Sequence, residues 1–255
     1  MSRWLKVVAW IAGGLVGLLV VGVLALAIGV WVASDPKPVG TSGPEAEQLA
    51  ESLMDSVDHE AWERTGAVAW SMGGMRDHLW DRTRHLDRYH SGDLTVWIDL
   101  DTHQGRAEQG GEALTGAALT GALEDAWAAW ANDSFWLNPV VKVFDDGTQR
   151  ERVVLDDGRE ALLVSYSSGG VTPGDAYLWI PGPDGRPTHW RMWVQILPIG
   201  GLETTWEGWT QLPTGAWIAT THQSGLGLTI TMQDVRAAAT LAELEPDDPF
   251  AEIVE

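Results

Sequence analysis

The residues of this sequence that could do chemistry are its carboxylates, histidines and glycine-flanked serines, and their spacing excludes the common sites. The segment HEAWE (59–63) lacks the second histidine of the zinc-protease pattern HExxH. In DLDTHQG (99–105) the glycine stands one position too late for a calcium loop, and no glutamate follows at the required spacing. SYSSGG (165–170) lacks the first glycine of a nucleophile elbow. We therefore predict no metal site, no cofactor and no enzyme activity.

Two groups of ionisable residues remain. His78, His85 and His90 alternate with arginines and aspartates, which we interpret as a charged ladder on a solvated strand face. Glu203 and Glu207 lie four residues apart on a predicted strand, about 13 Å from each other. That separation exceeds the ~5–9.5 Å of a glycosidase pair. A glycan hydrolase would need carboxylates from separate strands, and it is the lesser alternative.

Tryptophan is the unusual residue type, because the chain has 16 and several lie between residues 188 and 217. On a strand Trp190 faces opposite to Trp193, and the odd separation of Trp206 and Trp209 places them on opposite faces too. A curled sheet accounts for both sets, because tryptophans on its convex face would be partly exposed or lie under a loop. Its concave face, if the helices fill it incompletely, forms an apolar cavity, a usual site for lipophilic ligands. Stacking on sugar rings is the other common use of such a cluster. The predicted ligand-binding residues are the tryptophans of the cavity and three polar side chains at its rim: Trp136, Lys142, Trp190, Arg191, Trp193, Glu203, Trp206 and Trp209.

Length and composition limit the classes of protein that fit. The chain has 255 residues, Lys+Arg 16, Asp+Glu 36, a formal net charge of −20 and no cysteine. One domain of roughly 200 residues with an appendage fits this length. The acidic balance argues against a nucleic-acid partner, because phosphate binding needs a basic footprint. The absence of cysteine excludes disulfides, thiolate metal sites and a lipid-attachment cysteine.

The N-terminus is predicted to anchor the chain in a membrane. No residue from 7 to 33 is charged, and a helix of that length spans about 40 Å, more than the ~30 Å hydrocarbon core. Arg3 and Lys6 precede the segment and acidic residues follow it, so the N-terminus is predicted to stay in the cytoplasm. A cleaved signal peptide is the alternative, but its apolar region is typically ~7–15 residues. We predict a single-pass anchor over 1–33 in a bacterial inner membrane, a linker over 34–43 and a domain facing the periplasm.

The remainder of the chain is predicted to be mainly β, of the α+β class. A helix begins at Pro44, strands are predicted over 67–72, 78–90 and 94–99, and a second helix with a 3.6-residue period covers residues 119–130. From residue 148 the pattern is antiparallel β, with predicted strands that include 160–166 and 202–212 and turns such as Asp157-Gly158 and Asp184-Gly185. We expect a curled antiparallel half-barrel of about 10–11 strands wrapped on two or three helices over 44–240, and a frayed acidic tail over 241–255.

Three segments of the second half of the chain resemble a known group of bacterial envelope proteins. They are DSFWLNPVVKVFDDGTQR (133–150), GGVTPGDAYLWI (169–180) and WRMWVQILPIGGLETTWEGW (190–209). That uncharacterised group is similar to the outer-membrane lipoprotein carrier superfamily, the LolA/LolB-like and RseB-like half-barrels. The resemblance implies an antiparallel sheet of about eleven strands around helices, with an apolar cavity for acyl chains.

These observations lead to one main functional prediction and two alternatives. The main prediction is a membrane-anchored periplasmic protein that binds a lipidic or acylated ligand in a half-barrel cavity, in lipoprotein or lipid handling. The first alternative is a protein-interaction or envelope-sensing module without a small ligand, as the RseB-like branch would imply, with another envelope protein as its partner. The glycan hydrolase is the second.

Overall fold

The computed structural model describes residues 34–168 and 172–253. The predicted membrane anchor, residues 1–33, lies outside them. Within the described ranges no helix combines the length and the apolar character needed to cross a bilayer. The described chain is mainly β with a few helices, and none of its sheets closes into a barrel.

The first sheet consists of eight antiparallel strands, most of them joined by short hairpins. In spatial order they are β14 (Thr221–Gln223), β15 (Thr229–Ala238), β1 (Ala67–Met72), β2 (Arg76–Asp81), β3 (Leu86–Ser91), β4 (Leu94–Asp99), β5 (Gly105–Gln109) and β6 (Glu112–Ala113). Side chains alternate between the two faces. Val68 and Trp70 of β1 point to the concave face, whereas Ala67 and Ala69 pack on the convex one.

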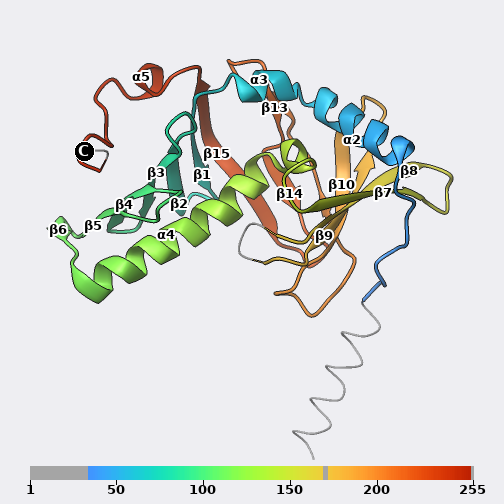
Figure 1. Ribbon diagram of the computed structural model, residues 1–255, viewed down its shortest axis with the longest axis horizontal. Helices are drawn as coiled ribbons and strands as arrows, with labels where there is room; N and C mark the ends of the chain where they lie inside the picture. Colours follow the sequence, from blue (N-terminus) through green and yellow to red (C-terminus); the bar gives the residue numbers. More distant parts are fainter. Residues whose placement is uncertain (1–33, 169–171, 254–255) are drawn as a thin grey trace, which may run out of the picture.

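The second sheet has five antiparallel strands. They are β11 (Leu202–Thr205), β10 (Pro187–Trp193), β9 (Ala176–Pro181), β8 (Glu160–Tyr166) and β7 (Thr148–Val154), with a small sheet of β12 (Thr210–Gln211) and β13 (Trp217–Ile218) beside them. Two isolated bridges, Thr204 to Ser224 and Glu207 to Thr221, connect β11 and the residues after it to β14 and the residue after it. The two main sheets therefore follow one another in a single open arch (Figure 1).

The described residues form fifteen strands, more than the ten or eleven predicted, because several predicted strands are broken; two of them show how. The stretch predicted as one strand over 78–90 turns back at residues 82–85 and becomes β2 and β3. The stretch predicted over 202–212 is interrupted after Thr205, and β12 begins only at Thr210.

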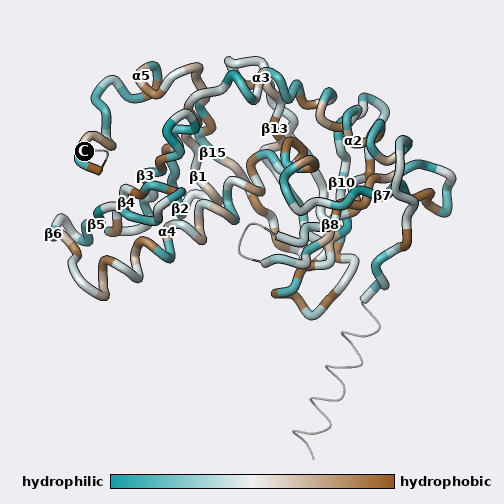
Figure 2. Tube along the Cα trace, viewed as in Figure 1, coloured by the Kyte–Doolittle hydropathy of each residue, from teal (hydrophilic) through white to brown (hydrophobic). Residues whose placement is uncertain are grey.

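Helices cover the concave side of the arch (Figure 1). They are α2 (Pro44–Ser56), α3 (His59–Glu63), α4 (Gly116–Leu137) and the 3₁₀ helix η1 (Pro139–Lys142). The short α5 (Leu241–Leu244) belongs to the C-terminal segment and packs on the convex face. Pro44 begins α2 and two glutamates occupy its first turn, which suits the positive end of the helix dipole. Hydrophobic residues recur along α4 (Figure 2), and Leu123, Ala126 and Trp130 pack against the concave face of the first sheet.

The C-terminal segment is packed on the convex face, so the prediction of a frayed tail was wrong for residues 241–253. Phe250 is completely buried against Leu79 and Leu86. Arg84 donates two hydrogen bonds to Asp248, at 2.7 and 2.9 Å. Phe250, the one aromatic residue of this segment, holds it on the sheet. The prediction of a frayed tail had followed from the acidic composition of the segment.

Candidate ligand-binding site

Aromatic side chains fill the space between the end of α4 and the concave face of the second sheet. Trp136 of α4 lies with its ring centre 5.0 Å from that of Trp190 and 6.3 Å from that of Trp206. Trp190 is completely buried and also contacts Trp179 of β9, at 4.8 Å between ring centres. The structure thus brings three of the predicted tryptophans together in one cluster.

Trp209 joins the same cluster, contrary to the prediction that Trp206 and Trp209 lie on opposite faces. Their ring centres are 6.3 Å apart. The prediction assumed an unbroken strand, but the chain leaves β11 after Thr205, and Gly208 has a φ of 65°. That left-handed backbone reverses the direction of the following side chain and is accessible to glycine at little cost.

Three predicted site residues lie on the other, convex face of the second sheet. Arg191 and Glu203 are cross-strand partners on β10 and β11, and the Arg191 Nε lies 3.4 Å from a Glu203 carboxylate oxygen. Trp193 is half-buried, and its indole N–H donates a hydrogen bond of 2.8 Å to the backbone carbonyl of Asp35. The structure does not bring these three residues into contact with the concave cluster.

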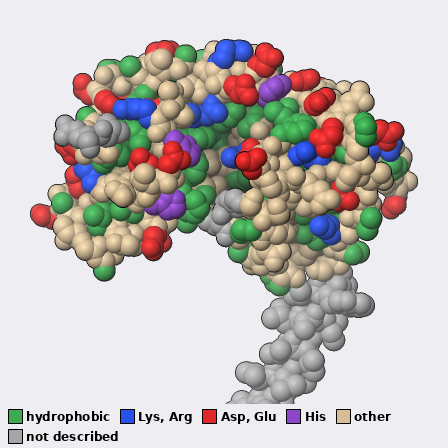
Figure 3. Space-filling model, in the orientation of Figure 1, with side chains coloured by type: hydrophobic (Ala, Val, Ile, Leu, Met, Phe, Trp, Pro, Cys, Tyr) green, Lys and Arg blue, Asp and Glu red, His purple; other side chains and the backbone are tan. Residues whose placement is uncertain are grey.

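Lys142, the remaining predicted residue, lines a cleft between α2, α3, β2 and the C-terminal end of α4. The cleft has a volume of about 220 Å³. Figure 3 shows this side of the molecule, where hydrophobic side chains gather in a hollow near basic ones. At the edge of the cleft, the Nζ of Lys142 lies 3.5 Å from the Oδ2 of Asp145. The cleft is lined by Met54, His59, Trp62, Glu63, Trp80, Arg82, Ser134, Asn138, Val141, Lys142 and Asp145.

Arg82 is the central cation of the cleft. Its guanidinium carbon lies 4.4 Å from the ring centre of Trp62 and 5.2 Å from that of Trp80, in cation–π geometry. One of its terminal nitrogens donates to the backbone carbonyls of Trp62 and Thr65. Burial lowers the pKa of Arg82 to about 10, against the opposing charge of Glu63. The side chain therefore remains cationic at neutral pH.

Three buried N–H groups of this cleft have no hydrogen-bond partner among the described residues. They are the Nε of Arg82, the side-chain amide of Asn138 and the indole nitrogen of Trp80. A buried donor without a partner costs about 1–3 kcal/mol. All three groups are donors on residues that line the cleft, and Met54 and Val141 offer apolar contact there.

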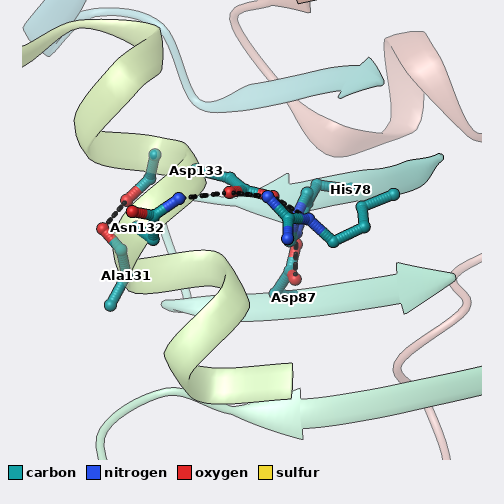
Figure 4. Close-up of polar contacts among 7 residues, drawn as sticks. His78, Asp87, Ala131, Asn132 and Asp133 are labelled. Atoms are coloured by element: carbon teal, nitrogen blue, oxygen red, sulfur yellow. Dashed lines mark hydrogen bonds and ion pairs between the residues drawn. The ribbon is translucent and has the colours of Figure 1, made fainter. Parts of the chain in front are cut away.

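A buried charge network fixes α4 to the first sheet (Figure 4). His78 of β2 lies between two carboxylates, with its Nδ1 2.8 Å from Asp87 and its Nε2 3.2 Å from Asp133 of α4. Arg76 donates two hydrogen bonds to Asp133, at 2.7 and 2.8 Å. The side chains of His78, Asp87 and Asp133 are completely buried. The predicted solvated ladder is thus wrong for His78 and Asp87.

The network favours a charged histidine. Burial alone would lower the pKa of His78, but the charge of Asp87 and the hydrogen bond to Asp133 outweigh it and raise that pKa to about 9. With a carboxylate oxygen at each ring nitrogen, both nitrogens donate, as only the protonated ring can. His78 therefore carries a positive charge, which lies on the concave face of the first sheet next to the Asp133 carboxylate.

Asp133 was missed as a candidate, although the helix pattern held a signal for it. It stands seven residues after Ala126, three after Trp130 and four before Leu137, on the buried stripe of α4. A carboxylate on an apolar stripe needs a buried partner, because an unpaired buried charge is very costly. The helix pattern therefore indicates that Asp133 has a buried partner, but it does not identify the residue of the sheet that pairs with it.

No protein-family model matches the sequence, and no curated protein sequence matches it either. The solved structures that are similar to it include the following two. A crystal structure of a DUF1329 family protein from Desulfovibrio piger has a TM-score of 0.39 and 9% identity, covering 75% of this chain and 92% of its own. A crystal structure of a proposed outer membrane lipoprotein-sorting protein domain from Vibrio parahaemolyticus has a TM-score of 0.30 and 10% identity, covering 74% and 93%.

Proposed function

We propose that this protein is a membrane-anchored, periplasm-facing binding protein for a lipidic or acylated ligand. The observation that carries the proposal is the cleft beside Arg82, where three buried donors without partners adjoin apolar walls. Donors of this kind fit the carbonyl, carboxylate or phosphate oxygens of an amphiphile's polar end. The apolar walls fit the first part of its hydrocarbon.

The hydrocarbon chain would extend from the cleft toward the aromatic cluster. Trp136, Trp190, Trp206 and Trp209 already fill that space, so the chain enters only as α4 or these side chains move. Asp133 is the polar attachment of α4 to the first sheet. In this proposal the ligand takes the place of protein side chains and does not enter an empty cavity.

Ligand binding is tested with the full chain purified from its membrane. Extraction and mass spectrometry are expected to find a co-purifying amphiphile, and a fluorescent fatty acyl probe is expected to bind. In Arg82→Gln the probe affinity should fall about tenfold to a hundredfold, since a hydrogen bond to a charged group contributes ~1.5–3 kcal/mol. Arg159→Gln, in an exposed turn, is the matched control and should bind as the unaltered chain does. A ligand-free protein that takes up no probe would refute the proposal.

The filled interior also favours a second candidate, a protein-interaction or envelope-sensing module without a small ligand. Here the aromatic cluster is simply the core, and an exposed apolar surface contacts another envelope protein. Cross-linking of the full chain in its native membrane separates the two. A specific envelope protein captured by a chain that carries no lipid supports the sensing role.

A further inference from the structure

Three neighbouring turns at one end of the arch form a continuous edge. They are residues 73–75 between β1 and β2, 194–201 between β10 and β11, and 224–228 between β14 and β15. The N–H of Gly225 donates to Glu203 at the start of β11, and the N–H of Gly73 donates to Thr231 of β15. These three turns are called the apolar rim.

The apolar rim exposes large aliphatic side chains. Met75 is 72% exposed, Ile196 73%, Leu226 53% and Leu228 64%. The turns read GGM, VQILPIGG and SGLGL, and they contain no charged residue. Turns are normally polar, and most of the exposed large hydrophobic side chains among the described residues lie on this rim.

Three turns at the opposite end of the two main sheets have the usual turn chemistry. The turns at 82–85, 155–159 and 182–186 each contain arginine, aspartate or both. Arg159 pairs with Asp157 and Arg186 with Asp184 inside their own turns. The uncharged turns of the apolar rim therefore differ in polarity from these three turns.

The chain enters the described structure at the apolar rim. The N–H of Gly200 donates a hydrogen bond of 2.9 Å to the hydroxyl of Ser34, and the N–H of Asp35 donates one of 2.9 Å to the carbonyl of Gly200. Ser34 is thus fixed to the turn 194–201. In the sequence it directly follows the uncharged run over residues 7–33.

We infer that the apolar rim lies in the interfacial layer of the bilayer that holds residues 7–33. The inference rests on the anchoring given under the proposed function and adds the surface by which the domain sits on the membrane. Ser34, fixed to the rim, places these turns at the end of the anchor. The chain carries a net charge of −20, which anionic lipids repel, and the uncharged rim can approach them without that repulsion. Aliphatic tips in the interface lose their contact with water.

The absence of cysteine from the chain allows a clean test by single-site labelling. Ile196→Cys, Leu226→Cys and Met75→Cys carry an environment-sensitive fluorophore, and Val154→Cys, 57% exposed at the opposite end, is the matched control. The full chain is reconstituted in vesicles of phosphatidylcholine and phosphatidylglycerol with shallow spin-labelled lipids. We expect blue-shifted emission and severalfold stronger quenching at the three rim positions than at residue 154.

Each outcome decides the inference. Quenching by lipid at the rim alone supports it. Rim probes that remain in water, on a chain that resists alkaline extraction, overturn it and leave the anchoring intact. Rim probes that are shielded from water but unquenched by lipid also overturn it, because a protein partner or a second copy then covers the rim. A chain released by alkaline extraction refutes the anchoring itself and removes the basis of the inference.

Discussion

The single carboxylate of Asp133 joins the inserted helix α4 to the first sheet. Arg76 and His78 both donate to it, and it has no exposed side-chain surface. Burying charges offsets much of the attraction between them, so a complete network adds little net stability. Removing Asp133 is different, since it leaves Arg76 without this partner and the buried His78 with only one carboxylate.

Asp133→Asn is therefore expected to destabilise the fold by about 3–5 kcal/mol, the usual cost of breaking a buried ion pair. Urea unfolding of the full chain in detergent micelles, followed by tryptophan fluorescence, measures this change. Asp157→Asn, in an exposed turn, is the control and should leave the midpoint unchanged. Equal midpoints for both variants would contradict the role assigned to Asp133.

The charged state of His78 predicts a dependence of stability on pH. Its folded pKa of about 9 lies above its ordinary value of 6.5, so the folded state holds the proton more tightly than the unfolded chain. The resulting stabilisation is complete below about pH 6.5 and is lost as the pH rises through about 9. As the pH is raised from about 6.5 to about 9, the thermal midpoint of the unaltered chain should fall, and that of His78→Gln should fall less. Parallel curves for the two proteins would contradict the prediction.

The elements show how far the sequence specified the fold. β1, β4 and β8 have the bounds predicted from alternating residues and glycine turns. The turn at 82–85 was missed because His85, with a φ of 58°, occupies the left-handed position where glycine is expected. Trp206 and Trp209 were placed on opposite faces because Gly208 was read as part of a strand. Local signals marked most strands, but the partners of Asp133 and the filling of the interior depend on packing between distant segments.

The C-terminal segment is an element whose contribution can be measured at one residue. Phe250 is completely buried on the convex face of the first sheet. Phe250→Ala should destabilise the protein by about 3–5 kcal/mol, as expected for a buried aromatic side chain. Val154→Ala removes an exposed side chain and should have little effect on the urea midpoint. If Phe250→Ala also had little effect, the tail would be no part of the cooperative fold.

At the scale of the whole molecule, charge repulsion opposes folding. The excess of acidic over basic residues gives a net charge of −20, and salt screens exposed charges strongly. Raising NaCl from about 0.05 M to about 0.5 M should increase the thermal midpoint of the full chain by a few degrees. Asp133→Asn should show the same increment, because buried charges are screened much less. A midpoint that falls with salt would indicate that attractive surface pairs dominate.

The position of Arg82 has a consequence for traffic through the protein. Arg82 follows the end of β2, whereas the apolar rim precedes its start, and six strand residues span about 20 Å. If the rim lies on the bilayer, as we infer, Arg82 stands about that distance from the membrane surface. A ligand bound beside Arg82 under the proposed function would then have to leave the bilayer surface, at least in part, to reach the cleft.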